Sequence, residues 1–287
     1  MTDTWTTIKD WPDALRLERL SDAGVARIML NRPEKKNSLT GEIFQAFFES
    51  LEIIRADREL KVLITKGEGG CYSSGFYLPF LRATSQEGLA DWDKPRTMDR
   101  LAEELRFFPR VTIAQVEGYC LGGALAMMNS HDLVFAAEDA QMGMPEVMRG
   151  SFGQFATCTL FHSQIPMKKA AYIQLVGENI SGAEADRVGL VSRAYPAAQL
   201  EEKTNAFARE LSLRHLAVLE HAKIAAQMGR DLSLTDAMKL DHLVGQILTL
   251  LIAGGLAVAV YIGGILLLKV EEINLVKRAV MAKLGKK

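Results

Sequence analysis

The sequence has few of the residues that build metal centres or disulfide frameworks. It holds 3 cysteines, Cys71, Cys120 and Cys158, an odd number with no CxxC spacing, so a disulfide framework or a zinc site is not expected. Its 5 histidines show no HxxxH or HExxH spacing, which argues against a metal enzyme. We therefore expect no metal ion and a reducing compartment.

An excess of charge and an N-terminal apolar run are also missing. The formal net charge is −1 over 287 residues, so the composition gives no reason to expect a nucleic-acid partner. The first residues, MTDTWTTIKDW, lack the apolar core of a secretory signal. We therefore expect a cytoplasmic protein, and the hydrophobic share of 48% is that of an ordinary globular chain.

What the chain does contain is a repeated alternation of strand and helix patterns. ALRLERL and VARIML alternate apolar and polar residues around Asp22-Ala23-Gly24, which predicts a hairpin. A helical pattern follows a predicted N-cap at Thr40, and KVLITKGEGG and VTIAQV are typical of buried strands. Ser181 is placed to cap a later helix that Gly189 ends. The pattern predicts an α/β fold with parallel strands covered by helices, then a helical C-terminal part.

The stretch from Glu117 to Val147 organises the rest of the chain. Gly122 and Gly123 lie between a predicted strand and a predicted helix, where backbone amides can stabilise a negative charge. Glu146 is the one carboxylate of the later MGMPEV segment. An anion site followed by a single acid favours proton transfer next to a carbonyl. The alternative is a tight turn and a surface glutamate.

Five motifs together resemble the crotonase family, also called the enoyl-CoA hydratase/isomerase superfamily. They are NRPEKKNSL, GGCYSSGFYL, EGYCLGGALAMMNSHDL, MGMPEVMRG and LVGENISGAEADRVGLVSRAYP. Their order and spacing agree with the family from about residue 13 to about residue 225. The resemblance implies a spiral of ββα turns, a C-terminal helical region that forms a homotrimer or a dimer of trimers, and an acyl-CoA thioester as substrate. It implies no cofactor apart from the coenzyme A of that substrate.

The resemblance also assigns roles to individual residues. The amides of Phe76 and Gly123 would form the oxyanion hole, with Gly122 at the start of the supporting helix and Glu146 as proton carrier. The same resemblance places three further residues on the coenzyme A portion of the substrate. Ser73 and Ser74 would line the groove for adenine and pantetheine, and Lys35 would contact phosphate, with a solvated turn as the alternative for the lysine.

Two departures from the family pattern bear on the reaction. Ala126 occupies the position of the first of two glutamates that hydratases of the family use, and Tyr77 replaces a usual aspartate. One acid fits simpler proton chemistry better than the addition of water. We therefore expect an acyl-CoA lyase or isomerase of fatty acid metabolism. The alternatives are a hydrolase that cleaves a carbon–carbon bond of a β-diketone, and a trimeric scaffold that has lost activity.

The family's C-terminal helices are replaced by an uncharged segment. We divide the chain into a crotonase-like core (1–200), a helical region (201–246), and an apolar helix with a basic tail (247–287). Residues 247–268 hold 22 residues without a charge, enough to span a bilayer. Basic residues prefer the cytoplasmic side, where the enzyme itself is expected. Membrane contact through 247–268, a helix buried in a trimer and a fused segment all remain open.

Overall fold

The computed structural model describes residues 3–79, 97–151, 153–243 and 255–256. The chain divides into two compact units, Met1–Ile224 and Ala225–Lys287. The sequence-based divisions after residues 200 and 246 stay predictions. All of the predicted site residues belong to the first unit.

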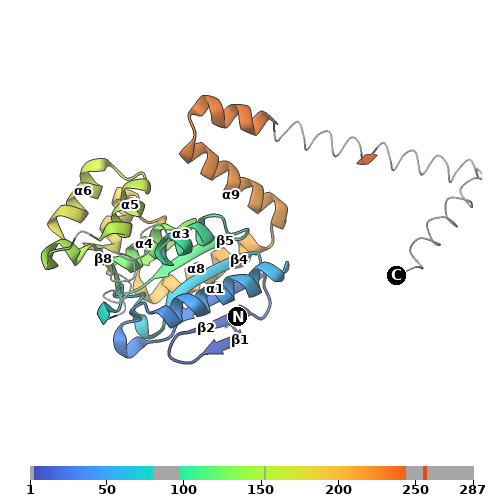
Figure 1. The fold of residues 1–287 in the computed structure, drawn as a ribbon. Coiled ribbons are helices and arrows are strands. Elements are labelled where there is room, and N and C mark those ends of the chain that lie inside the picture. Colours follow the sequence, from blue (N-terminus) through green and yellow to red (C-terminus); the bar gives the residue numbers. More distant parts are fainter. Residues whose placement is uncertain (1–2, 80–96, 152, 244–254, 257–287) are drawn as a thin grey trace, which may run out of the picture. The chain divides into compact units, whose positions relative to one another are not determined.

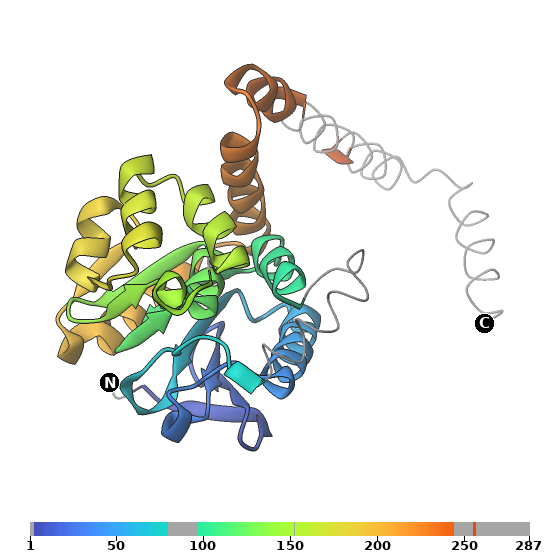
Figure 2. The ribbon, with the colours of Figure 1, turned by 60° about the vertical axis from the view of Figure 1, so that its left-hand side comes forward.

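A seven-stranded sheet forms the centre of the first unit, with the order β1-β2-β3-β4-β5-β7-β10 (Figures 1 and 2). The strands are β1 Trp5–Trp11, β2 Leu15–Leu20, β3 Val25–Leu30, β4 Val62–Gly67, β5 Val111–Val116, β7 Leu133–Ala137 and β10 Arg193–Tyr195. The first three are antiparallel neighbours, and from β3 onward the pairs are parallel. The predicted α/β fold and the hairpin are confirmed, whereas β1 had no expected counterpart in the sequence pattern.

A second, three-stranded sheet carries the glycine stretch. It consists of β6 Tyr119–Leu121, β8 Gln141–Gly143 and β9 Ile180–Ser181. β6 runs parallel to β8, and β8 runs antiparallel to β9. This small sheet joins the residues that precede Gly122 to those that precede Glu146, so it brings the two ends of the stretch together.

Helices connect and cover these strands. They are α1 Gly41–Ala56, α3 Thr97–Arg106, α4 Gly123–Asn129, α5 Gln154–His162, α6 Met167–Val176, α7 Gly182–Val188, α8 Ala197–Ser212 and α9 Leu216–Asp231, and residues 234–243 are also helical. Short 3-10 turns occur at η1 Pro33–Lys35, η2 Glu68–Gly70 and η3 Pro145–Arg149. The predicted caps are confirmed: Thr40 accepts the Ile43 amide at the start of α1, and Ser181 accepts the Glu184 amide at the start of α7.

The two faces of the large sheet carry different chemistry. α8 packs on one face, where its Glu201 accepts hydrogen bonds from Arg27 of β3 (3.0 Å) and Lys66 of β4 (3.1 Å). On the other face, Thr65 of β4 reaches His131, which follows α4. Since neighbouring residues of a strand point to opposite faces, α8 and α4 lie on opposite sides of the sheet (Figure 1).

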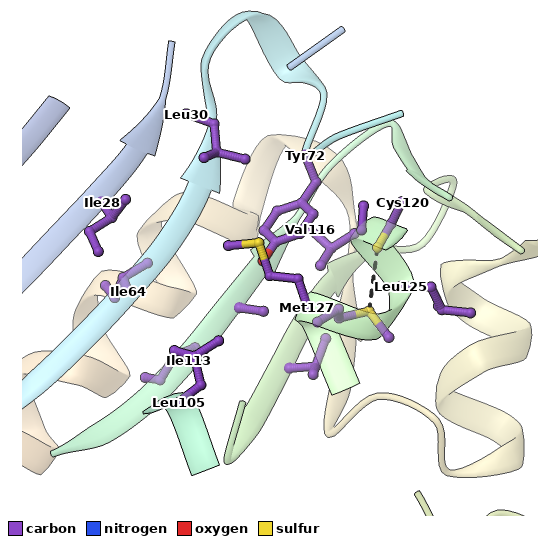
Figure 3. Packing of buried hydrophobic residues seen from close by; sticks show 14 of the residues in the cluster. Ile28, Leu30, Ile64, Tyr72, Leu105, Ile113, Val116, Cys120, Leu125 and Met127 are labelled. Carbon is purple, nitrogen blue, oxygen red and sulfur yellow. Dashed lines mark hydrogen bonds between the residues drawn. The ribbon is translucent and has the colours of Figure 1, made fainter. Parts of the chain in front are cut away.

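The apolar core lies between the sheet and α4. Figure 3 shows Leu30 of β3, Val116 of β5 and Met127 of α4 in this interior, with Tyr72 among them, and Leu125 on the side of α4 that faces away from these strands. Each of these five side chains is at most 1% exposed. The start of α4 is therefore anchored in well-packed core, which fixes the glycine turn that precedes it.

The predicted apolar segment 247–268 lies outside the described residues, apart from Gly255 and Leu256. Within the part of the chain that the structure describes, no helix combines the length and the apolar character needed to cross a bilayer.

Candidate active site

The turn before α4 requires glycine at Gly122. This residue has φ +52°, in the left-handed region that disfavours side chains. Its amide donates to the carbonyl of Gly143 at 2.9 Å, and its carbonyl accepts the Ala126 amide, the first intrahelical hydrogen bond of α4. The Gly123 amide thus belongs to the first turn of the helix, where N–H groups have no partner within the helix. The Gly123 N–H therefore points away from the body of α4, beyond its N-terminal end.

The segment around Phe76 is fixed beside the glycine turn. The carbonyl of Gly75 accepts the Leu39 amide (2.8 Å), and the Tyr77 amide donates to the carbonyl of Leu39 (2.9 Å). Because successive amides of an extended strand point in alternate directions, the Phe76 N–H points away from Leu39. A Cβ added to Gly75 would lie 3.5 Å from the Gly123 nitrogen. The two amides predicted for the oxyanion hole are therefore neighbours in space.

Glu146 reaches the same turn from the other side. It lies in η3, and a Cβ placed on Gly122 would overlap its carboxylate oxygen Oε1. A Cβ on Gly153, whose φ is +59°, would come within 3.1 Å of its Cδ. The carboxyl group therefore lies between two backbone positions that only glycine can occupy without displacing it.

The environment of this carboxyl group is poor in partners. Its Oε2 atom is buried and accepts no hydrogen bond from the residues that the structure describes. Burial raises the pKa of Glu146, and a hydrogen bond from its own backbone amide and the charge of Arg149 oppose that shift only in part. A carboxyl group with a raised pKa, held against an amide turn, is better equipped to take up and return a proton than an ordinary surface glutamate.

The three residues assigned to coenzyme A differ in exposure. Ser73 is fully buried, and its hydroxyl accepts the Gly75 amide at 3.1 Å. Its visible contribution is thus to the shape of the Phe76 segment. Ser74 is half-buried, and Lys35 is exposed on η1. Contact of these three residues with a substrate stays a prediction.

Sequence reasoning missed a cation–aromatic pair next to these residues. The Lys36 ammonium lies 4.5 Å from the centre of the Tyr119 ring, at the start of β6. Lys36 adopts the left-handed conformation, and its carbonyl accepts the Ser74 amide. The spacing of Lys36 and Tyr119 in the sequence gave no signal, because β6 and η1 meet only in the folded chain.

The structure shows what surrounds Ala126 and Tyr77, the two departures from the family pattern. Ala126 is fully buried in α4, so no acid stands at that position. Tyr77 is 40% exposed with Arg32 5.6 Å from the centre of its ring.

His131 and Asp132 form no catalytic pair. Burial lowers the pKa of His131 to about 4. Its Nδ1 donates to the carbonyl of Met127, and its Nε2 accepts from Thr65. Asp132 binds Thr112 and Lys223 instead. Among the described residues, no group of three or more His, Cys, Asp or Glu side chains is arranged to hold a metal ion.

Together these features define a class of protein: an α/β domain in which the Phe76 segment and a half-buried carboxyl group both lie against one glycine turn. The Enoyl-CoA hydratase/isomerase family model matches residues 21–246. The chain therefore belongs to the enoyl-CoA hydratase/isomerase family, as the sequence motifs predict.

Individual relatives agree with this assignment. The chain is 28% identical over 213 residues to hydroxycinnamoyl-CoA hydratase-lyase of Pseudomonas fluorescens, covering 73% of this chain and 77% of the relative. It is 31% identical to enoyl-CoA hydratase domain-containing protein 2 of Bos taurus, covering 72% and 69%. An enoyl-CoA hydratase structure from Geobacillus kaustophilus superposes with a TM-score of 0.72 at 29% identity, covering 85% and 91%.

Proposed function

We propose that this protein is an acyl-CoA lyase or isomerase that works through an enolate, with Glu146 as its single proton carrier. The observation that carries the proposal is the Glu146 carboxyl group. It is half-buried, its Oε2 is fully buried with no partner among the described residues, and its pKa is raised beside the Gly122 turn. Such a group costs folding free energy, and a role in proton transfer accounts for its retention.

The proposed reaction follows from this geometry. Glu146 removes the proton from the α carbon of the thioester, and the electron pair moves onto the thioester oxygen. The amides of Phe76 and Gly123 hold that oxygen as it becomes negative, each contributing on the order of 3 kcal/mol. When the substrate carries a β,γ double bond, the enolate is a conjugated dienolate, and returning the proton to its γ carbon shifts the double bond to the α,β position. Coenzyme A is part of the substrate, and no other cofactor enters the scheme.

The presence of a single acid in the proposed site argues for isomerase or lyase activity over hydratase activity. A hydratase needs one group to activate water and one to deliver a proton, and Ala126 stands where the family's first glutamate would be. The relatives include a hydratase-lyase, which supports bond cleavage as one outcome of the same enolate chemistry. We therefore rank isomerisation and lyase chemistry before hydration.

The test is exchange of the α protons of butyryl-CoA with D₂O, followed by NMR. The parent protein should catalyse the exchange. Glu146→Gln keeps the shape but removes the titrating group, so the rate should fall by about 10²-fold or more. Glu138→Gln is the control, because Glu138 is an exposed acid of the same stretch, and it should exchange like the parent.

Each other result removes a part of the proposal. A Glu146→Gln rate within about threefold of the parent would contradict the role of Glu146. Binding of acyl-CoA without exchange would favour the scaffold. Cleavage of a β-diketone by a protein that does not bind acyl-CoA would favour the hydrolase.

We also propose that the protein assembles as a trimer through its C-terminal region. Helix α9 and the following helix leave apolar side chains exposed, among them Val218, Ile224, Leu234 and Met238. Exposed apolar groups of this number are typical of contact surfaces. Light scattering of the full chain tests this: a monomeric mass would contradict it.

A further inference from the structure

We propose that the Phe76 side chain restricts the acyl group of the substrate to chains that are unbranched at the α carbon. This inference rests on the proposed function, because it takes the Phe76 and Gly123 amides as the site of the thioester oxygen. It concerns the ring, whereas the oxyanion hole uses only the backbone of the same residue.

The ring lies directly on the oxyanion turn. A Cβ added to Gly123 would be 2.6 Å from two ring carbons of Phe76, Cδ2 and Cε2. One edge of the ring therefore rests against the Gly123 backbone. The ring therefore occupies the volume beside the α carbon of Gly123, next to the amide that would hold the thioester oxygen.

A second aromatic ring supports Phe76. The centre of the Phe44 ring lies 5.9 Å away, tilted by 44°. Phe44 belongs to α1 and is 2% exposed, so it is held firmly in the core. This separation is typical of favourable aromatic pairs. The Phe76 ring therefore cannot withdraw toward α1 without displacing buried side chains.

The backbone of Phe76 is equally constrained. Leu39 bonds the residues on both sides of it, and the neighbouring Gly75 has φ +89° with no room for a side chain against the Leu121 carbonyl. A shift of the backbone that moved the ring would move the Phe76 amide as well. The Phe76 ring, which would limit the acyl group, and the Phe76 amide, which would hold the thioester oxygen, therefore move together.

The Phe76 ring would thus form a rigid wall next to the thioester carbonyl. We call its effect on branched acyl groups the steric filter. A straight chain places one carbon at the α position and can extend away from the wall. A branched chain adds a methyl group beside the same carbon, where a rigid wall resists it. Forcing one extra methyl group into such a site typically costs about tenfold or more in affinity.

The experiment compares two isomers, butyryl-CoA and isobutyryl-CoA, which differ only in the branch at the α carbon. Calorimetry should show that the parent binds butyryl-CoA about tenfold more tightly. Phe76→Ala keeps the backbone amide and removes the ring, so the two affinities should come within about threefold of each other. Phe107→Ala is the control, since Phe107 is 65% exposed on the segment that follows α3, and it should keep the parent ratio.

The outcomes separate the two proposals. If the parent binds neither thioester nor free coenzyme A, the proposed function fails and the filter falls with it. If the parent binds both isomers equally, or Phe76→Ala retains the preference, only the filter is overturned. Should Phe76→Ala prove unfolded by circular dichroism, Phe76→Leu replaces it. The smaller, more flexible side chain should lower the ratio in the same direction, and an unchanged ratio would again overturn the filter.

Discussion

Asp132 and Glu146 are two acids of one glycine-rich stretch, and the fold treats them in opposite ways. Asp132 accepts hydrogen bonds from the Thr112 amide (2.8 Å), the Thr112 hydroxyl (2.9 Å) and the Lys223 ammonium (2.8 Å). Glu146 has its Oε2 buried without a partner among the described residues. The first arrangement stabilises the fold, whereas the second places a carboxyl group where its charge is costly.

Lys223, the partner of Asp132, has all of its hydrogen-bond donors satisfied. Lys223 is nearly fully buried in α9, where its ammonium also donates to the carbonyls of Leu105 and Arg110 at 3.1 Å each. Burial lowers the pKa of Lys223, and Asp132 opposes that shift. Every donor position of this cation is used, as expected of a buried charge that is structural. A buried acid with an unused oxygen next to a glycine turn is more typical of chemistry.

The largest effect is expected from a change that moves Glu146 without altering it. Gly122→Ala would place a methyl group on the Glu146 carboxylate and strain a residue with φ +52°. We expect the α-proton exchange rate to fall by about 10²- to 10³-fold, since both the acid and the neighbouring amide are displaced.

The control for Gly122→Ala is Gly189→Ala, because Gly189 has φ +81° and nothing within 4 Å of an added Cβ. Gly189→Ala therefore introduces backbone strain without a contact to Glu146. Equal losses of activity in the two variants would mean that backbone strain, rather than the position of Glu146, limits the reaction.

Much of this site was accessible from the sequence, because it is built on local signals. Glycines at Gly122 and Gly123, the cap at Thr40 and the lone acid Glu146 all lie in motifs with fixed spacing. These positions depend on short-range backbone geometry, which residue type reports directly. The parallel sheet followed from the same alternation of strand and helix patterns.

Long-range packing was less accessible. The burial of Ser73, the pairing of Lys36 with Tyr119 and the contact of Lys223 with Asp132 join residues far apart in the chain. The periodicity of the sequence does not indicate that Lys223 will be enclosed by the carbonyls of a distant segment. The place of the Phe76 ring on Gly123 belongs to the same group, because it depends on how β6 meets the segment after η2.

The second prediction concerns the paired acid. Asp132→Ala leaves the Lys223 ammonium buried without its counter-charge, so the free energy of unfolding should fall by about 3 kcal/mol. Urea denaturation of the parent and the variant measures this difference. Adding Lys223→Met to Asp132→Ala removes the unpaired charge and should restore part of the loss. If the double variant is less stable than Asp132→Ala, the ion pair is not the source of the effect.

The smallest effect is expected on the stability of Glu146→Gln, and its sign is opposite to that of Asp132→Ala. Burial raises the pKa of Glu146 above its usual 4.5, so its contribution to stability is fully present below pH 4.5 and is lost as pH rises through the pKa of the folded state. Glu146→Gln removes this loss. The variant should therefore be more stable than the parent at pH 7 by about 1 kcal/mol.

The pH dependence identifies the cause of that gain. As pH falls toward 4.5, the carboxyl group of the parent becomes protonated, and the stability difference between parent and Glu146→Gln should shrink. Urea denaturation at pH 7 and near pH 4.5 measures both ends of this range. A gain that is the same at both pH values would come from packing of the amide, and the burial of charge would not explain it. A loss of stability at pH 7 would place Glu146 with Asp132, as an acid that the fold needs, and would erase the contrast between them.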